Sequence, residues 1–330
     1  MRARRIAFMC LLILAASCAE PAAEEPEGTT LRYSYRAGET LSYELELDVE
    51  MTTQAAEPNT ASDNVDWAMS MELTERLDLA FAEGEDPATI RITMTQEVLD
   101  GQARVTSLGQ EQSIPLDQVT AGLENEVVVV VDPQGRLLSV SIGGSQLPAQ
   151  LLAALSSFSG STMLQPQQLG PEFPDRPLAV GDEWETSASA ELLGLTITQT
   201  SHHRVAAREE LLGHSTYRIE SRITTGPYTA TLESLLAELQ AHPGLLGGGD
   251  AAQLDDALAQ FAAQGIEAEF AMAESTASLT TWFDPEEGRV VRSELSAPTS
   301  MSIALGGTPG AGYGTMQIEM STRQRMTLTG

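Results

Sequence analysis

Residues 41–51 read LSYELELDVEM, and this stretch decides the fold. Apolar side chains stand at every odd position from Leu41 to Met51, and polar or acidic side chains stand at every even position. Successive side chains of a β-strand point to opposite faces. The pattern therefore predicts a strand with one face in a core and one acidic face in water.

The same alternation returns in residues 67–73, 90–94, 217–223 and 316–321. Strands with one apolar face are typical of antiparallel sheets, because parallel sheets are covered on both faces. We therefore expect a mainly β protein with one or more curved antiparallel sheets and a few helices. The valine run at 127–131 predicts a more central strand that is apolar on both faces.

Two short motifs occur twice, in the same order. Gly38-Glu39-Thr40-Leu41 and Gly181-Asp182-Glu183-Trp184 each open an apolar stretch, and they lie 143 residues apart. Asp132-Pro133-Gln134-Gly135-Arg136 and Asp284-Pro285-Glu286-Glu287-Gly288-Arg289 have the composition of hairpin turns, and they lie 152 residues apart. The order and the similar spacing favour two related halves. Chance matches of short motifs are the alternative.

The chain divides into segments by composition. We expect a signal peptide at 1–17, a disordered tether at 18–30, a first β-rich half at 31–164, a linker at 165–176 and a second β-rich half at 177–330. Leucines at helical spacing predict helices at 146–158 and 232–239, and a further helix at 251–264 would start from Asp250. The second half would thus carry a helical insertion near 231–264.

The N-terminus has the features of a secretory signal peptide. Basic residues precede an apolar run from Ile6 to Ala16, which is about half of the roughly 20 residues that span a bilayer. Cys18 follows the small residues Ala15, Ala16 and Ser17. This segment resembles the lipobox of bacterial lipoproteins, although Ala15 stands where that motif usually carries leucine. An ordinary secretory signal with a chance cysteine is the alternative.

The lipobox resemblance implies cleavage before Cys18 and attachment of acyl chains to this residue. Two or more chains give a stable membrane anchor where one chain does not. Ala19 follows the cysteine. In the sorting pattern of Gram-negative lipoproteins, aspartate at this place retains the protein at the inner membrane. The resemblance therefore implies a lipid-anchored envelope protein of the outer membrane that faces the periplasm.

Composition excludes several kinds of chemistry. Cys10 leaves with the signal peptide, so the mature chain has Cys18 alone and forms no internal disulfide or cysteine metal site. All 18 basic residues are arginine, which excludes lysine Schiff bases and P-loop lysines. A net charge of −29 disfavours nucleic acid as a partner. The dispersed acids indicate a solvated surface, and affinity for a basic protein or divalent cations is the alternative.

Neither a catalytic motif nor a metal-binding motif appears. Serine-hydrolase elbows, zinc-protease motifs, Walker loops and calcium loops are absent from the sequence. His202 and His203 are adjacent in a predicted strand, so they point to opposite faces and cannot jointly bind a metal. We expect surface or edge-strand histidines, and one histidine with distant carboxylates is the alternative. The expectation is a non-enzymatic protein without metal or cofactor.

The leading functional interpretation is a binder of lipid or another apolar ligand. The expected helices would offer an apolar lining of Leu151, Leu155, Phe158, Leu235 and Leu239. The strand methionines fit a core, and a flexible lining for variable guests is the alternative. A structural or assembly partner of other envelope proteins is the second interpretation. A hydrolase ranks last because no motif supports it.

The second half also carries a family-like segment. Residues 173–184, FPDRPLAVGDEW, place Pro177 shortly before Val180-Gly181-Asp182-x-Trp184, and a later turn reads Phe-Asp-Pro-x-x-Gly-Arg. This layout resembles uncharacterised bacterial envelope lipoproteins with no assigned activity. The wider layout is reminiscent of lipoprotein carriers of the Lol system and of mycobacterial lipid-binding lipoproteins. Fold likeness alone implies no function.

The anchor hypothesis is tested by Cys18→Ser in cells. We expect the variant to leave the membrane pellet for the soluble fraction, because it has no thiol to acylate. Fractionation followed by immunoblotting measures the change. A variant that stays in the pellet like the parent protein contradicts the hypothesis.

Overall fold

The computed structural model describes residues 28–55, 67–86, 88–107, 109–115, 126–142, 145–147, 170–192, 195–231, 234, 267–306 and 315–330. In order, its strands are β1 (Thr40–Ala55), β2 (Trp67–Glu83), β3 (Ile90–Ser107), β4 (Gln110–Ile114), β5 (Val127–Val131), β6 (Leu137–Ile142), β7 (Ser145–Leu147), β8 (Glu183–Leu192), β9 (Leu195–Leu211), β10 (His214–Thr225), β11 (Tyr228–Thr231), β12 (Glu267–Met272), β13 (Ser275–Asp284), β14 (Arg289–Gly306) and β15 (Thr315–Leu328). They form one 15-stranded sheet. The expectation of a mainly antiparallel β protein is confirmed.

The sheet joins two runs of strands with the same order. Its path is β7-β6-β5-β3-β2-β1-β15-β14-β13-β10-β9-β8. Neighbouring strands of the first run are, in chain order, β1, β2, β3, β5, β6 and β7. Those of the second run are β8, β9, β10, β13, β14 and β15. Short extra strands interrupt each run after its third strand, as β4 in the first and as β11 and β12 in the second. The runs meet where β1 pairs antiparallel with β15.

The turns before β1 and β8 have matching hydrogen bonds. The N–H of Gly38 donates to Phe81 of β2, and the N–H of Gly181 donates to Val205 of β9, both at 2.8 Å. Phe81 and Val205 donate back, to Glu39 and to Asp182, at 3.0 and 2.9 Å. Each glycine has a positive φ, 84° and 98°, with no atom near the place of a Cβ. Glycine is needed at both positions for its backbone conformation.

The two Asp-Pro turns also match. In each turn the aspartate carbonyl accepts the glycine N–H, from Gly135 to Asp132 at 2.9 Å and from Gly288 to Asp284 at 2.8 Å. The aspartate Oδ1 accepts two further backbone N–H groups of its own turn, at 2.8–3.1 Å. The side chain thus closes the turn from inside, as aspartate commonly does.

Residues 28–36 run between these two turns as part of the core. The N–H of Tyr33 donates to Pro133 and the N–H of Ser34 donates to Gly288. Thr29 pairs with Leu178 through hydrogen bonds in both directions, each 2.9 Å long. The fold therefore begins by Gly28, and the expected boundary of the tether at residue 30 is too late.

The end of the expected linker is also core. Phe173 is 2% exposed, and its ring packs at a tilt against the rings of Tyr33, Trp184 and Phe283. The carbonyl of Glu172 accepts the indole N–H of Trp184 at 2.8 Å. Proline and glycine near 165–176 suggested a linker, but the large aromatic side chain within this segment fills the core.

The alternating pattern gives the sheet an inner and an outer face. The inner face carries Leu41, Tyr43 and Leu45 of β1, which belong to a buried cluster with side chains from β2, β3, β5, β9, β10, β13, β14 and β15. The valine strand β5 lies between β3 and β6, and only Val129 and Val131 are buried. The strand therefore buries one face only. The prediction that it would be packed on both faces is wrong.

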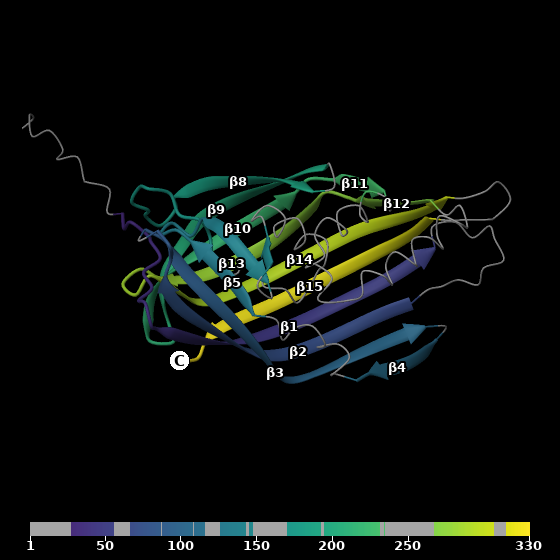
Figure 1. Cartoon of the computed structure of the whole chain (residues 1–330), viewed down its shortest axis with the longest axis horizontal. Coiled ribbons are helices and arrows are strands. Elements are labelled where there is room, and N and C mark those ends of the chain that lie inside the picture. The colour runs from purple at the N-terminus through teal and green to yellow at the C-terminus, as the bar shows by residue number, and fades with distance from the viewer. Residues whose placement is uncertain are drawn as a thin grey trace, which may run out of the picture.

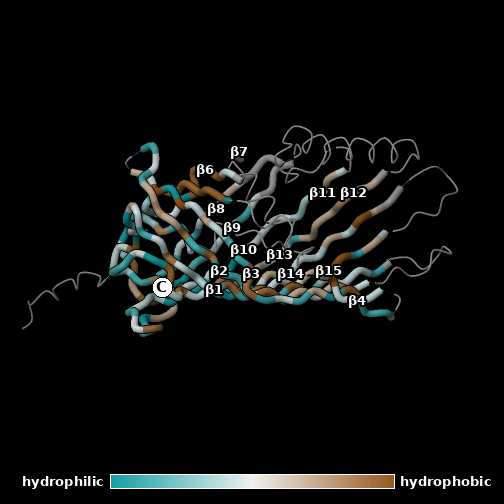
Figure 2. Tube along the Cα trace, turned by 60° about the horizontal axis from the view of Figure 1, so that its bottom comes forward, coloured by the Kyte–Doolittle hydropathy of each residue, from teal (hydrophilic) through white to brown (hydrophobic). Residues whose placement is uncertain are grey.

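The molecule has two different ends (Figure 1). We call the end with residues 28–36, the C-terminus and the Asp-Pro turns the N-terminal end. The opposite end, where β1 and β14 finish and β2 and β15 begin, is the far end. A second view shows the long strands as a curved layer (Figure 2). Most residues of the three expected helices lie outside the described part of the chain, while Gln146 and Leu147 lie in β7.

Two glycine substitutions separate backbone strain from packing. Gly38→Ala meets only the positive φ and should lower the free energy of unfolding by about 1 kcal/mol. Gly135→Ala has a similar φ, but its Cβ would lie 2.4 Å from the buried ring of Tyr33, so we expect a clearly larger loss. Urea denaturation of both variants measures this difference. Equal losses would contradict the close packing of Tyr33 on the turn.

Candidate functional site

The residues proposed from sequence as lipid attachment and apolar lining fall outside the described part of the chain. These are Cys18, Leu151, Leu155, Phe158, Leu235 and Leu239. No helix among the described residues is long and apolar enough to cross a membrane. The described site features therefore come from the sheet itself.

Every methionine of the described strands lies on the inner face. Cross-strand partners share a face, and Met51 of β1 pairs with Met320 of β15 and with Met69 of β2. Two inner-face rows further along, Ile303 of β14 pairs with Met316 of β15 and with Phe270 of β12. We call the far-end set the methionine face: Met51, Met69, Phe270, Met301, Ile303, Met316 and Met320.

The inner face is packed at one end and partly open at the other. Near the N-terminal end, Leu45, Leu77 and Ile219 are each at most 1% exposed. Every side chain of the methionine face is only half-buried. A contiguous set of large apolar side chains that keeps contact with solvent is a feature of binding surfaces. Unbranched methionines can fit guests of variable shape.

A pocket lies at the far end of the sheet. It has a volume of about 730 Å³ and lies where β11, β12, β14 and β15 meet. Its lining combines the inner-face row of Tyr228, Met272 and Met301 with the neighbouring outer-face row of Thr229, Ala271, Ser302 and Gln317. Burial raises the pKa of the Tyr228 phenol well above its ordinary value, so this group stays neutral. The volume is in the range of small-molecule sites.

The outer face has a second hollow of opposite chemistry. Its volume is about 780 Å³, and Glu46, Asp48, Glu72, Asp100 and Glu294 line it together with two arginines. Arg325 lies 3.1 Å from Glu46 and 3.2 Å from Glu294, and Arg323 lies 3.6 Å from Asp48. This charged surface suits a polar or basic partner and not an apolar guest.

Glu75 is a carboxylate on the apolar face. It lies between Leu73 and Leu77 along β2, opposite Leu45 of β1, and it is fully buried. Gln96 donates to its Oε2 at 3.3 Å, and Oε1 has no hydrogen-bond partner among the described residues. A β-bulge interrupts the pairing of β2 with β3 between Thr74 and Glu75. Burial raises the pKa of Glu75 to about 6.

The adjacent histidines point to opposite faces, as predicted, but one of them is not a surface residue. His202 is exposed beside Glu185. His203 is 5% exposed, with Nδ1 2.7 Å from Ser221 Oγ and Nε2 3.0 Å from Thr186 Oγ1. Burial, and to a lesser degree His202, lowers the pKa of His203 to about 4. Its neutral ring therefore serves as a hydrogen-bonded part of the core.

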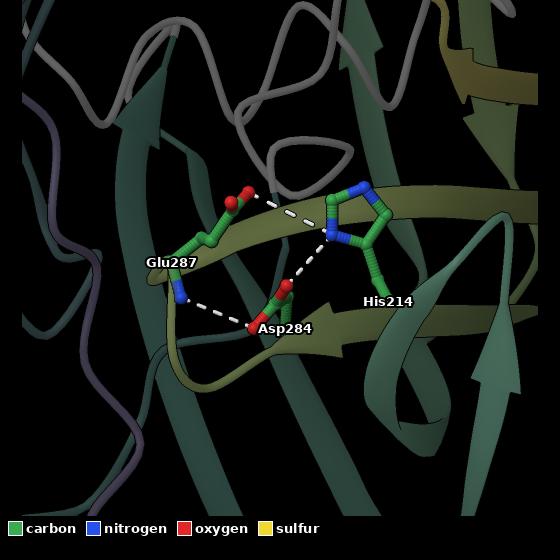
Figure 3. Close-up of side chains that lie close together, drawn as sticks. All are labelled: His214, Asp284 and Glu287. Carbon is green, nitrogen blue, oxygen red and sulfur yellow. Dashed lines mark hydrogen bonds and ion pairs between the residues drawn. The ribbon is translucent and has the colours of Figure 1, made fainter.

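A third histidine meets two carboxylates at the N-terminal end (Figure 3). His214 opens β10, and its Nδ1 lies 2.8 Å from Asp284 Oδ2 and 3.6 Å from Glu287 Oε2. Burial raises the pKa of Asp284, but hydrogen bonds from the Glu287 N–H, from His214 and from the Glu286 N–H outweigh it. The pKa therefore lies below its ordinary value, and Asp284 is ionised.

Sequence reasoning missed both groups, and only one of them left a signal. Glu75 stands where the alternation Met69, Met71, Leu73, Leu77 and Leu79 calls for an apolar residue, so its burial was readable. His214 and Asp284 are 70 residues apart, and no local pattern joins them. Asp284 was assigned to turn geometry, which its backbone hydrogen bonds confirm as one of its contacts.

No family model and no curated protein matches the chain. Lipovitellin, in a structure describing its lipid–protein interactions, is similar over 90% of this chain and 26% of its own, with 10% identity and a TM-score of 0.34. This chain thus spans about a quarter of the lipovitellin chain. An outer membrane channel from Pseudomonas putida F1 is similar over 90% of this chain and 97% of its own, with 6% identity and a TM-score of 0.23. Likenesses this distant carry no argument on function.

Glu75→Gln should stabilise the protein in a pH-dependent way. A folded-state pKa raised to about 6 means that stability is lost as pH rises from the unfolded pKa through 6. Removing the charge should therefore change little below pH 4.5 and raise the free energy of unfolding by about 2 kcal/mol above pH 6. Urea denaturation at pH 4.5 and pH 7.5 measures this change in the free energy of unfolding. Glu72→Gln, on the outer face of the same strand, is the control. A gain of equal size at both pH values would contradict the assignment.

Proposed function

We propose that this protein is a lipid-anchored envelope lipoprotein that binds lipid or another apolar ligand on its methionine face. The observation that carries the proposal is the row of half-buried methionines at the far end of an otherwise packed inner face. Burying such side chains under a ligand releases free energy in proportion to the apolar area removed from water.

The methionine face supports a broad rather than a narrow choice of ligand. Thioether side chains have three rotatable bonds and adapt their shape, so they discriminate weakly among apolar guests. Few polar groups border the far rows, and those present are hydroxyls such as Thr53 and Thr299. Such a lining holds a hydrocarbon portion and leaves a charged headgroup in water.

We also infer that the two runs of strands arose by duplication of one unit. The equal strand order, the matched turns before β1 and β8 and the matched Asp-Pro turns support this origin. The inserted β11 and β12 then belong to the second unit alone, and they supply Tyr228 and Met272. This edge of the sheet would thus be a later addition to a duplicated scaffold.

A role as an assembly partner of other envelope proteins is the second candidate function. The acidic hollow on the outer face favours it, because five carboxylates there outnumber two arginines. Charge complementarity of this kind would select a basic partner and would depend on salt. The two candidate functions use opposite faces of the sheet, so variants can separate them.

Ligand binding is tested with the mature Cys18→Ser protein and a fluorescent fatty-acyl probe. Met301→Gln and Met320→Gln place a polar amide under the ligand and should weaken binding by about tenfold each. Both side chains are half-buried, so the variants should remain folded. The control is Glu319→Gln, which changes the exposed neighbour of Met320 on the outer face.

Fluorescence titration gives the dissociation constants, and organic extraction of the purified protein shows any lipid carried from the cell. Saturable binding that the methionine variants weaken and the control leaves unchanged supports the proposal. If the parent protein takes up no probe and yields no lipid, ligand binding is refuted and the assembly role comes first.

A further inference from the structure

The two Asp-Pro turns differ in the group that meets the aspartate Oδ2. In the first turn, Arg136 follows Asp132 by four residues, and its Nε lies 2.7 Å from Oδ2. This is an ion pair within one turn. In the second turn, the group at Asp284 Oδ2 is Nδ1 of His214, which comes from the distant hairpin of β9 and β10. A permanent cation is replaced by an imidazole, which can also act as a metal ligand.

One additional residue in the second turn accounts for the change. The first turn reads Asp-Pro-Gln-Gly-Arg, and the second reads Asp-Pro-Glu-Glu-Gly-Arg. Arg289 therefore stands one place further from its aspartate and pairs with Glu287 at 3.0 Å and with Glu39 at 3.2 Å. The insertion moves the arginine away from Asp284 and brings a second carboxylate, Glu287, toward His214.

The three side chains have the geometry of a metal site. One ligand atom each from His214, Asp284 and Glu287 can be chosen so that all lie within 4.8 Å of one another. Figure 3 shows the imidazole Nδ1 facing both carboxylates. Zn²⁺ bonds to imidazole nitrogen and carboxylate oxygen at about 2.0–2.2 Å, so ligand atoms around one ion lie roughly 3–3.5 Å apart. Small side-chain rotations reach this spacing.

The surrounding structure holds the ligands in place. Asp284 is 4% exposed, and two backbone N–H groups fix its Oδ1, which leaves Oδ2 for His214 or an ion. His214 directly follows Leu212 and Gly213, whose φ angles of 52° and 86° form a tight hairpin turn. A leucine with positive φ is strained, and such strain often marks functional positions. The Glu287 side chain is 43% exposed, which leaves a path for an ion.

The local charge also favours a cation. With a neutral imidazole, the cluster contains the carboxylates of Asp284, Glu287 and Glu39 and the guanidinium of Arg289, which leaves a net charge of −2. A divalent cation would neutralise this charge.

We propose that His214, Asp284 and Glu287 form a binding site for a divalent transition-metal ion, with Zn²⁺ as the best match to one imidazole and two carboxylates. Three protein ligands leave a coordination position for water. The ion links the β9–β10 hairpin to the β13–β14 turn at the N-terminal end of the core. This proposal is independent of ligand binding at the methionine face, which lies at the other end of the sheet.

Zn²⁺ titration of the metal-stripped, mature Cys18→Ser protein tests the site. We expect saturable binding of one ion per chain by calorimetry, together with a rise in the thermal midpoint. His214→Gln and Glu287→Gln should each weaken binding at least tenfold and remove the thermal shift. Glu287 is largely exposed, so its variant tests the site even if His214→Gln folds poorly.

The control is His202→Gln, which removes an exposed histidine 3.1 Å from a single carboxylate, Glu185. It should leave Zn²⁺ affinity unchanged. Co²⁺ gives a second readout, because its visible absorption reports a nitrogen and oxygen ligand set and should be lost in Glu287→Gln. Absence of saturable binding in the parent protein, or equal affinity in His214→Gln and the parent, overturns the proposal.

Discussion

The pairing of β1 with β15 is the interaction on which the rest of the structure depends. It joins the first run of strands to the second, with continuous register from Tyr43 opposite Leu328 to Ala55 opposite Met316. A slip of one residue would turn every apolar side chain of β1 toward the outer face. The alternation in residues 41–51 prevents this slip, because the slipped strand would bury Glu44, Glu46, Asp48 and Glu50. The methionine face exists only in this register, since it combines side chains of both runs.

At the N-terminal end a second constraint supplements the sheet. Residues 28–36 contact both Asp-Pro turns and Leu178, so one short segment ties together parts of the chain that are far apart in sequence. The ring of Tyr33 occupies the space that a side chain at Gly135 would need. The turns are therefore shaped around this segment, which explains why their glycines serve packing as well as backbone conformation. The proposed metal ion would add one more link at the same end.

Sequence patterns predicted the strands. They did not predict the segments that pack on the sheet or the contacts between distant side chains. Period-two alternation is a local property, and the strands at 41–51, 217–223 and 316–321 follow it. The segments at 28–30 and 170–176 lack any period, so composition suggested a tether and a linker where Thr29 pairs with Leu178 and Phe173 enters the core. The burial of Glu75 could be read from the alternation of β2, because this acid stands at an apolar position of the pattern. The contact of His214 with Asp284 depends on the strand order, which no local pattern contains.

The two ends of the molecule separate the proposed roles in space. Under the proposed anchoring, the ten residues from Cys18 to Gly28 span at most about 35 Å, so the N-terminal end stays near the bilayer. Met51 lies eleven residues along β1 from Thr40, which is roughly 35 Å further from that end. The methionine face would touch the same bilayer only if the strands lay flat on it. A net charge of −29 opposes that contact with anionic lipid. The upright arrangement is favoured, and it directs the methionine face away from the anchoring membrane, toward whatever delivers or receives the ligand.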